Sequence, residues 1–407
     1  MVVNVMYTGG SAGAIYSQDS TITVDGCTFV NNTSASPGSG GGGIAILESA
    51  SRVSSITNSY FSGNWGVSGG GVYLSGSNVG GILTITGSIF ENCTAFYGGG
   101  AIRASAFALT LSNCILRDSS SSSGGGSMIL QNTTSLVEYC TFDRNVAAGN
   151  GGGALFRNST MVMNHCVVTR NSGLVGGGIY LDRAGSTIYN TTVSGNTATQ
   201  VGGGLGMNYS PVRIQNSTFA QNHASAYGGG INMNYHNSIA LHGIRFEQNT
   251  ALLGGGGVHV GSQANLTMTS SVFTSNIVTS GTGGGMNIMG TRTVFATVVA
   301  RDLSFIGNNA EAGGGGLYQS SMASVVCDAC QFSGNTAVYG PDKASGTLVI
   351  ILISAVLSDL CFVCSLFLHA SMFVCRGGGV VFVGVYPLAH LIPRCVASAP
   401  STNLRHV

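Results

Sequence analysis

Hydrophobic and polar residues alternate in short runs along most of this chain. Apolar residues occupy every second position at residues 44–46, 179–181 and 258–260, each directly after a cluster of glycines. A second set of alternating runs occurs later in each repeat, as at residues 109–111 and 239–241. Alternation with a period of two is typical of a β-strand that buries one face. The pattern therefore predicts an all-β protein built from short strands.

The glycine clusters recur at a regular interval. Successive clusters lie about 25 to 31 residues apart, within the range of solenoid repeats. Glycine permits close backbone approach at a turn where a Cβ atom would meet the neighbouring coil, so we expect each cluster to form a turn. The last glycines of the clusters are Gly43, Gly71, Gly100, Gly126, Gly153, Gly178, Gly204, Gly230, Gly257, Gly285 and Gly316.

A second mark, an aromatic or aliphatic residue three positions before an asparagine, precedes most clusters. Phe29 and Asn32 form the first such pair, and Phe332 and Asn335 form the last. We expect the Phe side chains to point inward and stack. Asparagine tolerates the left-handed backbone region, and its amide can hydrogen-bond to the same residue one coil away. The sequence thus predicts a structural turn ladder that includes Asn145, Asn171, Asn196, Asn222, Asn249 and Asn276.

Together the two marks predict one right-handed parallel β-helix, a single solenoid over roughly residues 10–340. With two or three strands per coil and ~4.8 Å between coils, about twelve coils would form a rod on the order of 55 Å long. We assign residues 1–342 to this repeat domain and residues 343–407 to an apolar tail.

The paired motifs resemble the GGAI and FxxN repeats of the chlamydial polymorphic outer membrane proteins. Residues 99–102 read GGAI and residues 152–155 read GGAL. Most other coils have a third glycine where that family has alanine. The resemblance implies a β-helical surface protein with a pectin-lyase-like fold.

The two ends of the chain differ from the repeats. The N-terminus has no basic flank or apolar stretch of signal-peptide length, so we expect a truncated start. The stretch that begins at Leu348 and ends at Cys375 is apolar and long enough to cross a bilayer. It is either a membrane anchor that leaves the rod outside the cell or translated non-coding sequence, because Asp359 near its midpoint opposes insertion. We expect an extracellular or cell-surface location.

Charged residues are scarce, with 15 Lys and Arg against 14 Asp and Glu among 407 residues. No basic patch favours nucleic acid, so no nucleic-acid partner is expected. The histidines share no column, and no cysteine pair has the spacing of a zinc site. We therefore expect neither a metal nor a cofactor.

Cysteines recur two positions before the Phe mark. Cys114, Cys140 and Cys166 fall in consecutive coils, so we expect them to stack as small buried thiols, with disulfides as the alternative. Cys327 and Cys330 form a CxxC motif within one strand pattern, and we do not expect them to pair.

Charged residues also occupy two adjacent positions after the Phe mark in successive coils: Glu91, Arg117 and Asp143 at the first, and Asp118, Arg144 and Arg170 at the second. Both columns mix their signs and should largely neutralise themselves. A polysaccharide lyase or hydrolase would instead gather like-signed carboxylates. We expect no enzyme activity, and keep a lyase that uses Asp118, Asp143 and Arg144 as the alternative.

The outward position of the post-glycine strand forms a column of aromatic and amide side chains with hardly any charge. Such a strip suits carbohydrate or protein contact, because rings stack on apolar surfaces and amides exchange hydrogen bonds. We therefore expect an adhesin-like or wall-associated scaffold that binds carbohydrate or protein along its long faces. The candidate binding residues are Tyr180, Asn232, His259, Asn287 and Tyr318.

Overall fold

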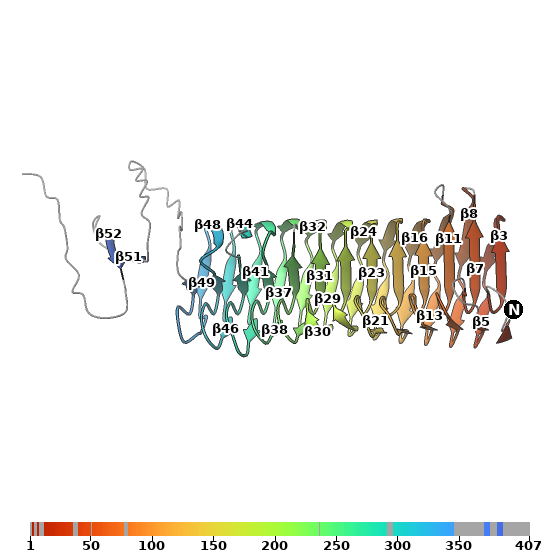
Figure 1. The fold of residues 1–407 in the computed structure, drawn as a ribbon, viewed down its shortest axis with the longest axis horizontal. Helices are drawn as coiled ribbons and strands as arrows, with labels where there is room; N and C mark the ends of the chain where they lie inside the picture. Colours follow the sequence, from red (N-terminus) through yellow and green to blue (C-terminus); the bar gives the residue numbers. More distant parts are fainter. Residues whose placement is uncertain are drawn as a thin grey trace, which may run out of the picture.

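The computed structural model describes residues 2–3, 6–7, 12–35, 40–49, 51–76, 80–235, 237–290, 296–345, 370–374 and 381–385. Up to residue 345 the described chain winds as stacked coils along a straight rod (Figure 1). Each strand pairs in parallel with the equivalent strand of the next coil, so every sheet runs the length of the rod. The all-β solenoid of about twelve turns is confirmed.

Each coil contributes to four sheets in the described residues, not to the two or three strands expected. The extra strands follow the asparagine, and all but β26 and β30 have only two residues, too few to show an alternation of their own. We number the sheets in chain order within a coil, starting after the glycines. The first turn joins sheets 1 and 2, the second turn joins sheets 2 and 3, the third turn joins sheets 3 and 4, and the glycine loop returns to sheet 1.

Sheet 1 contains β3 (Ile15–Gln18), β7 (Ile44–Glu48), β11 (Val72–Gly76), β15 (Ile102–Ser105), β19 (Met128–Gln131), β23 (Ala154–Arg157), β27 (Ile179–Asp182), β31 (Leu205–Asn208), β35 (Ile231–Asn234), β39 (Val258–Val260), β43 (Met286–Ile288), β47 (Leu317–Gln319) and β50 (Lys343–Ser345). Sheet 2 contains β4 (Thr23–Asp25), β8 (Val53–Thr57), β12 (Ile82–Thr86), β16 (Ala108–Ser112), β20 (Thr134–Glu138), β24 (Thr160–Asn164), β28 (Gly185–Tyr189), β32 (Pro211–Gln215), β36 (Ser238–His242), β40 (Asn265–Thr269), β44 (Ala296–Arg301) and β48 (Ala323–Asp328).

Sheet 3 contains β1 (Val2–Val3), β5 (Thr28–Val30), β9 (Tyr60–Ser62), β13 (Ile89–Glu91), β17 (Ile115–Arg117), β21 (Thr141–Asp143), β25 (Val167–Thr169), β29 (Thr192–Ser194), β33 (Thr218–Ala220), β37 (Arg245–Glu247), β41 (Val272–Thr274), β45 (Ser304–Ile306) and β49 (Gln331–Ser333). Sheet 4 contains β2 (Met6–Tyr7), β6 (Thr33–Ser34), β10 (Trp65–Gly66), β14 (Thr94–Ala95), β18 (Ser120–Ser121), β22 (Val146–Ala147), β26 (Ser172–Val175), β30 (Thr197–Val201), β34 (His223–Ala224), β38 (Thr250–Ala251), β42 (Ile277–Val278) and β46 (Asn309–Ala310).

The core is a single column of inward side chains from sheets 1, 2 and 3. The Phe side chains of sheet 3 stack in two runs, from Phe29 to Phe90 and from Phe219 to Phe332, with ring centroids 4.5–5.6 Å apart in six pairs. All of them are buried except Phe332 at the end of the rod, which is partly buried. Leu116, Val168 and Val193 occupy the same position in the middle coils and are equally buried. The inward Phe prediction is confirmed, and stacking of identical positions explains why one apolar pattern suffices for the whole rod.

The glycine loops need glycine for steric reasons. Gly202 has a φ of +70°, and a Cβ atom on Gly203 would lie 2.4 Å from the carbonyl oxygen of Gly229 in the next coil. A contact that short requires the backbone to shift. The expected close approach of neighbouring coils at these turns is confirmed.

The tail lies largely outside the described residues. Within the stretch from Leu348 to Cys375, only β51 (Ala370–Val374) is described, and it pairs antiparallel with β52 (Val381–Val385). Among the described residues, no helix is both long and apolar enough to cross a membrane. The membrane-anchor prediction concerns residues that lie mostly outside this description.

Candidate functional site

The asparagine ladder is a continuous hydrogen-bonded column at the third turn. The side-chain amide of Asn222 donates to Oδ1 of Asn249 at 3.0 Å and to the carbonyl oxygen of Val193 at 2.9 Å. Equivalent amide-to-amide bonds of 2.9–3.0 Å join the successive members, and all of them are buried. The predicted structural ladder is confirmed for Asn145, Asn171, Asn196, Asn222, Asn249 and Asn276.

The left-handed backbone conformation falls one residue earlier than expected. Arg144, Arg170 and Gln221 have φ values of 53°, 55° and 54°, and each precedes a ladder asparagine. The asparagine itself is therefore free to aim its amide along the rod. The residue before the asparagine makes the turn, and its type varies along the rod among Asn, Gly, Arg, Gln and Ser.

The cysteine column behaves as predicted over three coils. Cys114, Cys140 and Cys166 are buried and free. Hydrogen bonds with Cys114 and Cys166, together with burial, raise the pKa of the Cys140 thiol. A thiol that stays protonated is a poor nucleophile and a poor metal ligand. All three side chains are buried, which places the column in the core.

The CxxC motif does form a disulfide, which corrects the prediction. Cys327 is the buried, penultimate residue of β48, whereas Cys330 lies beyond the strand, past the left-handed Ala329 (φ 52°). The chain turns between them and brings the two Cα atoms to 5.8 Å. In the single extended strand that the sequence pattern predicts, the two Cα atoms would be too far apart for this bond.

The expected exposed binding column is covered, which is a second correction. Tyr180, Asn232, His259 and Asn287 are all buried, and only Tyr318 is partly exposed. The cause is the segment before each glycine cluster, which folds back over the outer face of sheet 1. Alternation along a strand identifies the outward side, but it does not reveal whether a loop covers that side.

Three contacts illustrate this cover. The ring of Tyr227 lies 4.5 Å from that of His259. Val175 packs against Tyr180, and the carbonyl oxygen of Thr282 accepts a hydrogen bond of 2.9 Å from the amide of Asn287. Burial lowers the pKa of His259 to about 4, partly offset by a hydrogen bond with Asn287.

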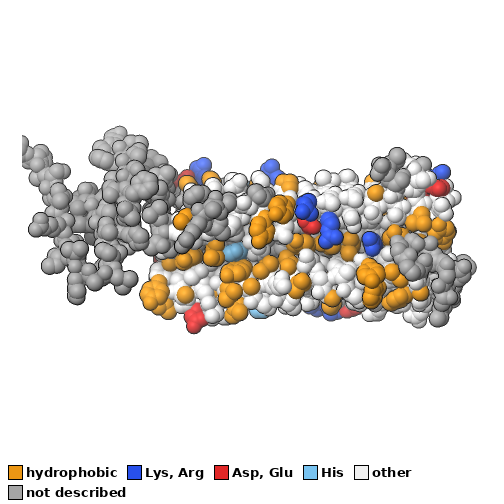
Figure 2. Space-filling model, viewed as in Figure 1, with side chains coloured by type: hydrophobic (Ala, Val, Ile, Leu, Met, Phe, Trp, Pro, Cys, Tyr) orange, Lys and Arg blue, Asp and Glu red, His pale blue; other side chains and the backbone are white. Residues whose placement is uncertain are grey.

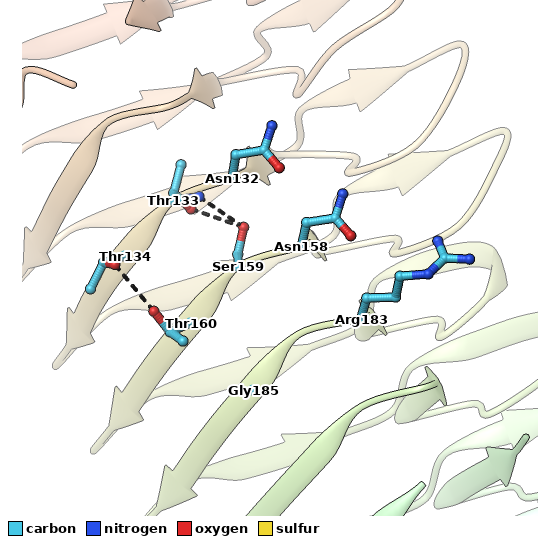
Figure 3. Close-up of a pocket in the computed structure, with 8 residues that line it drawn as sticks. All are labelled: Asn132, Thr133, Thr134, Asn158, Ser159, Thr160, Arg183 and Gly185. Atoms are coloured by element: carbon cyan, nitrogen blue, oxygen red, sulfur yellow. Dashed lines mark hydrogen bonds between the residues drawn. The ribbon is translucent and has the colours of Figure 1, made fainter. Parts of the chain in front are cut away.

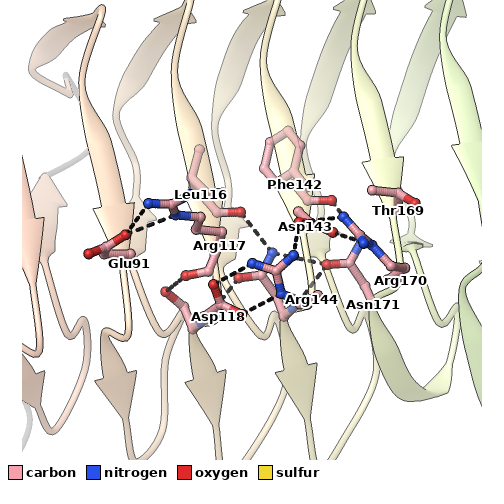
Figure 4. A network of polar contacts seen from close by, with 12 residues as sticks. Glu91, Leu116, Arg117, Asp118, Phe142, Asp143, Arg144, Thr169, Arg170 and Asn171 are labelled. Atoms are coloured by element: carbon pink, nitrogen blue, oxygen red, sulfur yellow. Dashed lines mark hydrogen bonds and ion pairs between the residues drawn. The ribbon is translucent and has the colours of Figure 1, made fainter.

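The mixed charge columns on sheet 3 and at the third turn form a network of polar contacts (Figure 4). It contains one separate ion pair, Arg117 with Glu91, and one linked group of Asp118, Arg144, Asp143 and Arg170. Arg144 donates two hydrogen bonds to the carboxylate of Asp118, at 2.7 and 2.8 Å, and a third to Asp143 at 2.6 Å. Arg170 donates two more to Asp143, at 2.8 and 2.9 Å. The three residues of the lyase hypothesis are therefore adjacent, but each carboxylate already has a guanidinium partner.

Two carboxyl groups of this network have lowered pKa values, as expected for carboxylates in ion pairs. The hydrogen bond from Arg144 lowers the pKa of Asp118. Hydrogen bonds from Tyr60 and Arg117 likewise lower the pKa of Glu91. A general acid at neutral pH needs a raised carboxyl pKa, and neither of these groups has one.

A different edge of the rod carries exposed side chains in a row. At the first turn, five successive coils place a residue with φ between 48° and 57° directly after the sheet 1 strand. All five side chains are exposed, and Figure 3 shows three of them projecting side by side from adjacent coils. We call this row the ridge; it consists of Asn132, Asn158, Arg183, Tyr209 and Tyr235.

Beside the ridge lies an open hollow of about 490 Å³. Thr134, Thr160 and Gly185, the first residues of β20, β24 and β28, line it together with the three polar ridge residues (Figure 3). Gly185 adds no side chain, so the row of threonines stops there. Figure 2 shows Lys or Arg side chains next to hydrophobic ones midway along one face of the rod.

Sequence reasoning missed the ridge. Four of its members stand five residues after the last glycine of their cluster, and Asn132 stands six residues after Gly126, so aligning the coils would have identified the column. Their diverse residue types hid it, because nothing in the sequence marks that position as left-handed and exposed.

Comparison with known proteins identifies the fold. A family model described as a right-handed beta helix region matches residues 43–205 and 176–300, and a search of the curated proteins found no match. Tailspike protein 3 of bacteriophage CBA120 is 13% identical over 82% of this chain and 57% of its own, with a TM-score of 0.28. A mannuronic acid specific family 6 polysaccharide lyase from the human gut microbiota is 10% identical over 73% of this chain and 77% of its own, with a TM-score of 0.21.

Proposed function

Because this chain belongs to the right-handed beta helix family, we propose that it is a non-enzymatic rod outside the cell or at its surface that binds carbohydrate along its length. The observation that carries the proposal is the ridge, where rings, amides and a guanidinium face solvent in one line. The resemblance of the repeats to the chlamydial surface proteins supports the location, as an adhesin-like or wall-associated element.

The charge arrangement supports a binding role over a catalytic one. The adjacent carboxylates of Asp118 and Asp143 both pair with Arg144. A calcium-assisted lyase needs carboxylates free to hold the cation, and a hydrolase needs one protonated carboxyl beside a charged one. Neither arrangement is compatible with these ion pairs.

The exposed rings support carbohydrate as the ligand. Tyr209 and Tyr235 stack with ring centroids 6.1 Å apart and are 44% and 51% exposed. A flat aromatic face suits the apolar face of a sugar ring, and neighbouring amides suit its hydroxyl groups.

The test combines binding with turnover. The purified chain is titrated with soluble glycans, neutral and acidic, and the products are separated by size with and without calcium. We expect saturable binding without chain shortening. Chain shortening that disappears in Asp143→Ala would instead establish the lyase, and no binding to any glycan would contradict the carbohydrate role.

A further inference from the structure

We propose that the ridge and its hollow form one binding site for an anionic glycan strand that lies parallel to the rod axis. This inference rests on the proposed function and names the site, the direction and the ligand class. The row of side chains, the shape beside it and the local charge each contribute to it.

Direction follows from the coil geometry. The five ridge residues occupy equivalent positions in consecutive coils and share one backbone conformation. Coils in a parallel solenoid are ~4.8 Å apart, so the row extends for about 19 Å along the axis. A ligand that contacts all five must itself be extended and parallel to the rod, as a linear polysaccharide is.

The ridge has a polar half and an aromatic half. Asn132 and Asn158 present amides at one end, whereas Tyr209 and Tyr235 present stacked rings at the other. Arg183 stands between the halves, with its guanidinium 5.4 Å from the ring centre of Tyr209 and 61% of its side chain exposed. Contact with the ring orients this guanidinium while leaving it accessible to a ligand.

The hollow is open because of one glycine that the fold does not require. A Cβ atom on Gly185 would meet only the side chains of Thr160 and Pro211, at the ordinary distances of 3.7 and 3.8 Å. Gly203, by contrast, has no space for a Cβ atom. Since packing tolerates a side chain at Gly185, the absence of one there leaves room beside the ridge for a ligand.

Charge favours an anionic strand. Asp182 pairs with Arg157 at 3.2 Å and more loosely with Arg183 at 3.5 Å. Arg213, exposed on β32 one coil away, forms no ion pair with any described residue. Three guanidinium groups against one carboxylate leave a local charge of +2, and arginine binds carboxylates through two parallel hydrogen bonds.

The experiment measures the affinity of the full chain for a hexamer of galacturonic acid and, separately, for cellohexaose. Arg183→Gln removes the central charge, and Gly185→Thr extends the threonine row into the hollow. The matched control is Tyr139→Ala, which removes an exposed ring from a left-handed position (φ 53°) at the second turn. Circular dichroism checks that each variant retains the β-helix.

We expect the acidic hexamer to bind with a Kd that rises with salt. Arg183→Gln and Gly185→Thr should each weaken binding at least about tenfold, while Tyr139→Ala leaves it unchanged. Binding that survives both ridge variants would refute this site while preserving the proposed function. A preference for cellohexaose would refute the anionic ligand class. If neither hexamer binds and none of the glycans of the wider panel binds, both this site and the proposed carbohydrate-binding function are refuted.

Discussion

Acidification should destabilise the rod through His259. This side chain is 5% exposed beneath the glycine loop, in one column with Asn232 and Asn287. Burial lowers its pKa from 6.5 to about 4. The unfolded chain therefore takes up a proton before the folded chain does, and stability is lost as the pH falls from about 6.5 toward 4.

The size of the effect follows from the shift. A difference of about 2.5 pKa units corresponds to roughly 3 kcal/mol, an upper value that is reached near the folded pKa. His259→Asn places an amide between two existing amides and removes the titrating group. It should lower stability at neutral pH, because the contact with the ring of Tyr227 is lost, but it should abolish this part of the pH dependence.

The assay is urea unfolding followed by circular dichroism at about pH 7.5 and 4.5. We expect the loss of stability between these pH values to be about 2 to 3 kcal/mol larger in the unmodified chain than in His259→Asn. His242→Asn, at an exposed histidine that bonds to Thr269, serves as the control and should retain the full loss. Equal losses in the unmodified chain and His259→Asn would refute the reasoning.

Three further predictions concern the core and the turns. Asn222→Leu should cost about 3 kcal/mol or more in urea unfolding, because Asn196 in the preceding coil and Asn249 in the following coil each lose a buried hydrogen bond. Asn190→Gly, at an exposed left-handed turn, should change stability by less than about 0.5 kcal/mol. Gly203→Ala should lower the free energy of unfolding by roughly 1 to 3 kcal/mol, while Gly185→Ala should leave it nearly unchanged. Equal losses in the two variants would contradict the difference in space that the two glycines have for a Cβ atom. Cys140 should resist iodoacetamide until urea is added, and rapid labelling of the folded chain, read by peptide mass spectrometry, would contradict the buried thiol column.

The repeat, the inward Phe stack and the asparagine ladder could be predicted because a solenoid repeats one local pattern. Phe219 and Asn222 need only their own strand and turn to be placed, and the next coil then stacks identical groups on them. The charge network could also be predicted, since Asp143 and Arg117 share a register position that counting residues reveals. Ion pairs within and between the two columns confirm that the arrangement as a whole neutralises itself.

The path of the coils follows from the sequence alone, because period-two alternation and glycine spacing are local properties of the chain. Which outward side chains meet solvent depends instead on how the coils pack together. His259 and Tyr180 point away from the core yet are buried, because the chain before the next glycine cluster folds over them. Arg183 and Tyr209 form part of a candidate site only because the sheet 1 strands that precede them end at equivalent positions in adjacent coils. Whether a loop covers a side chain, and whether side chains align across coils, depends on residues about one full coil away. The alternation within a single strand does not indicate where those residues lie.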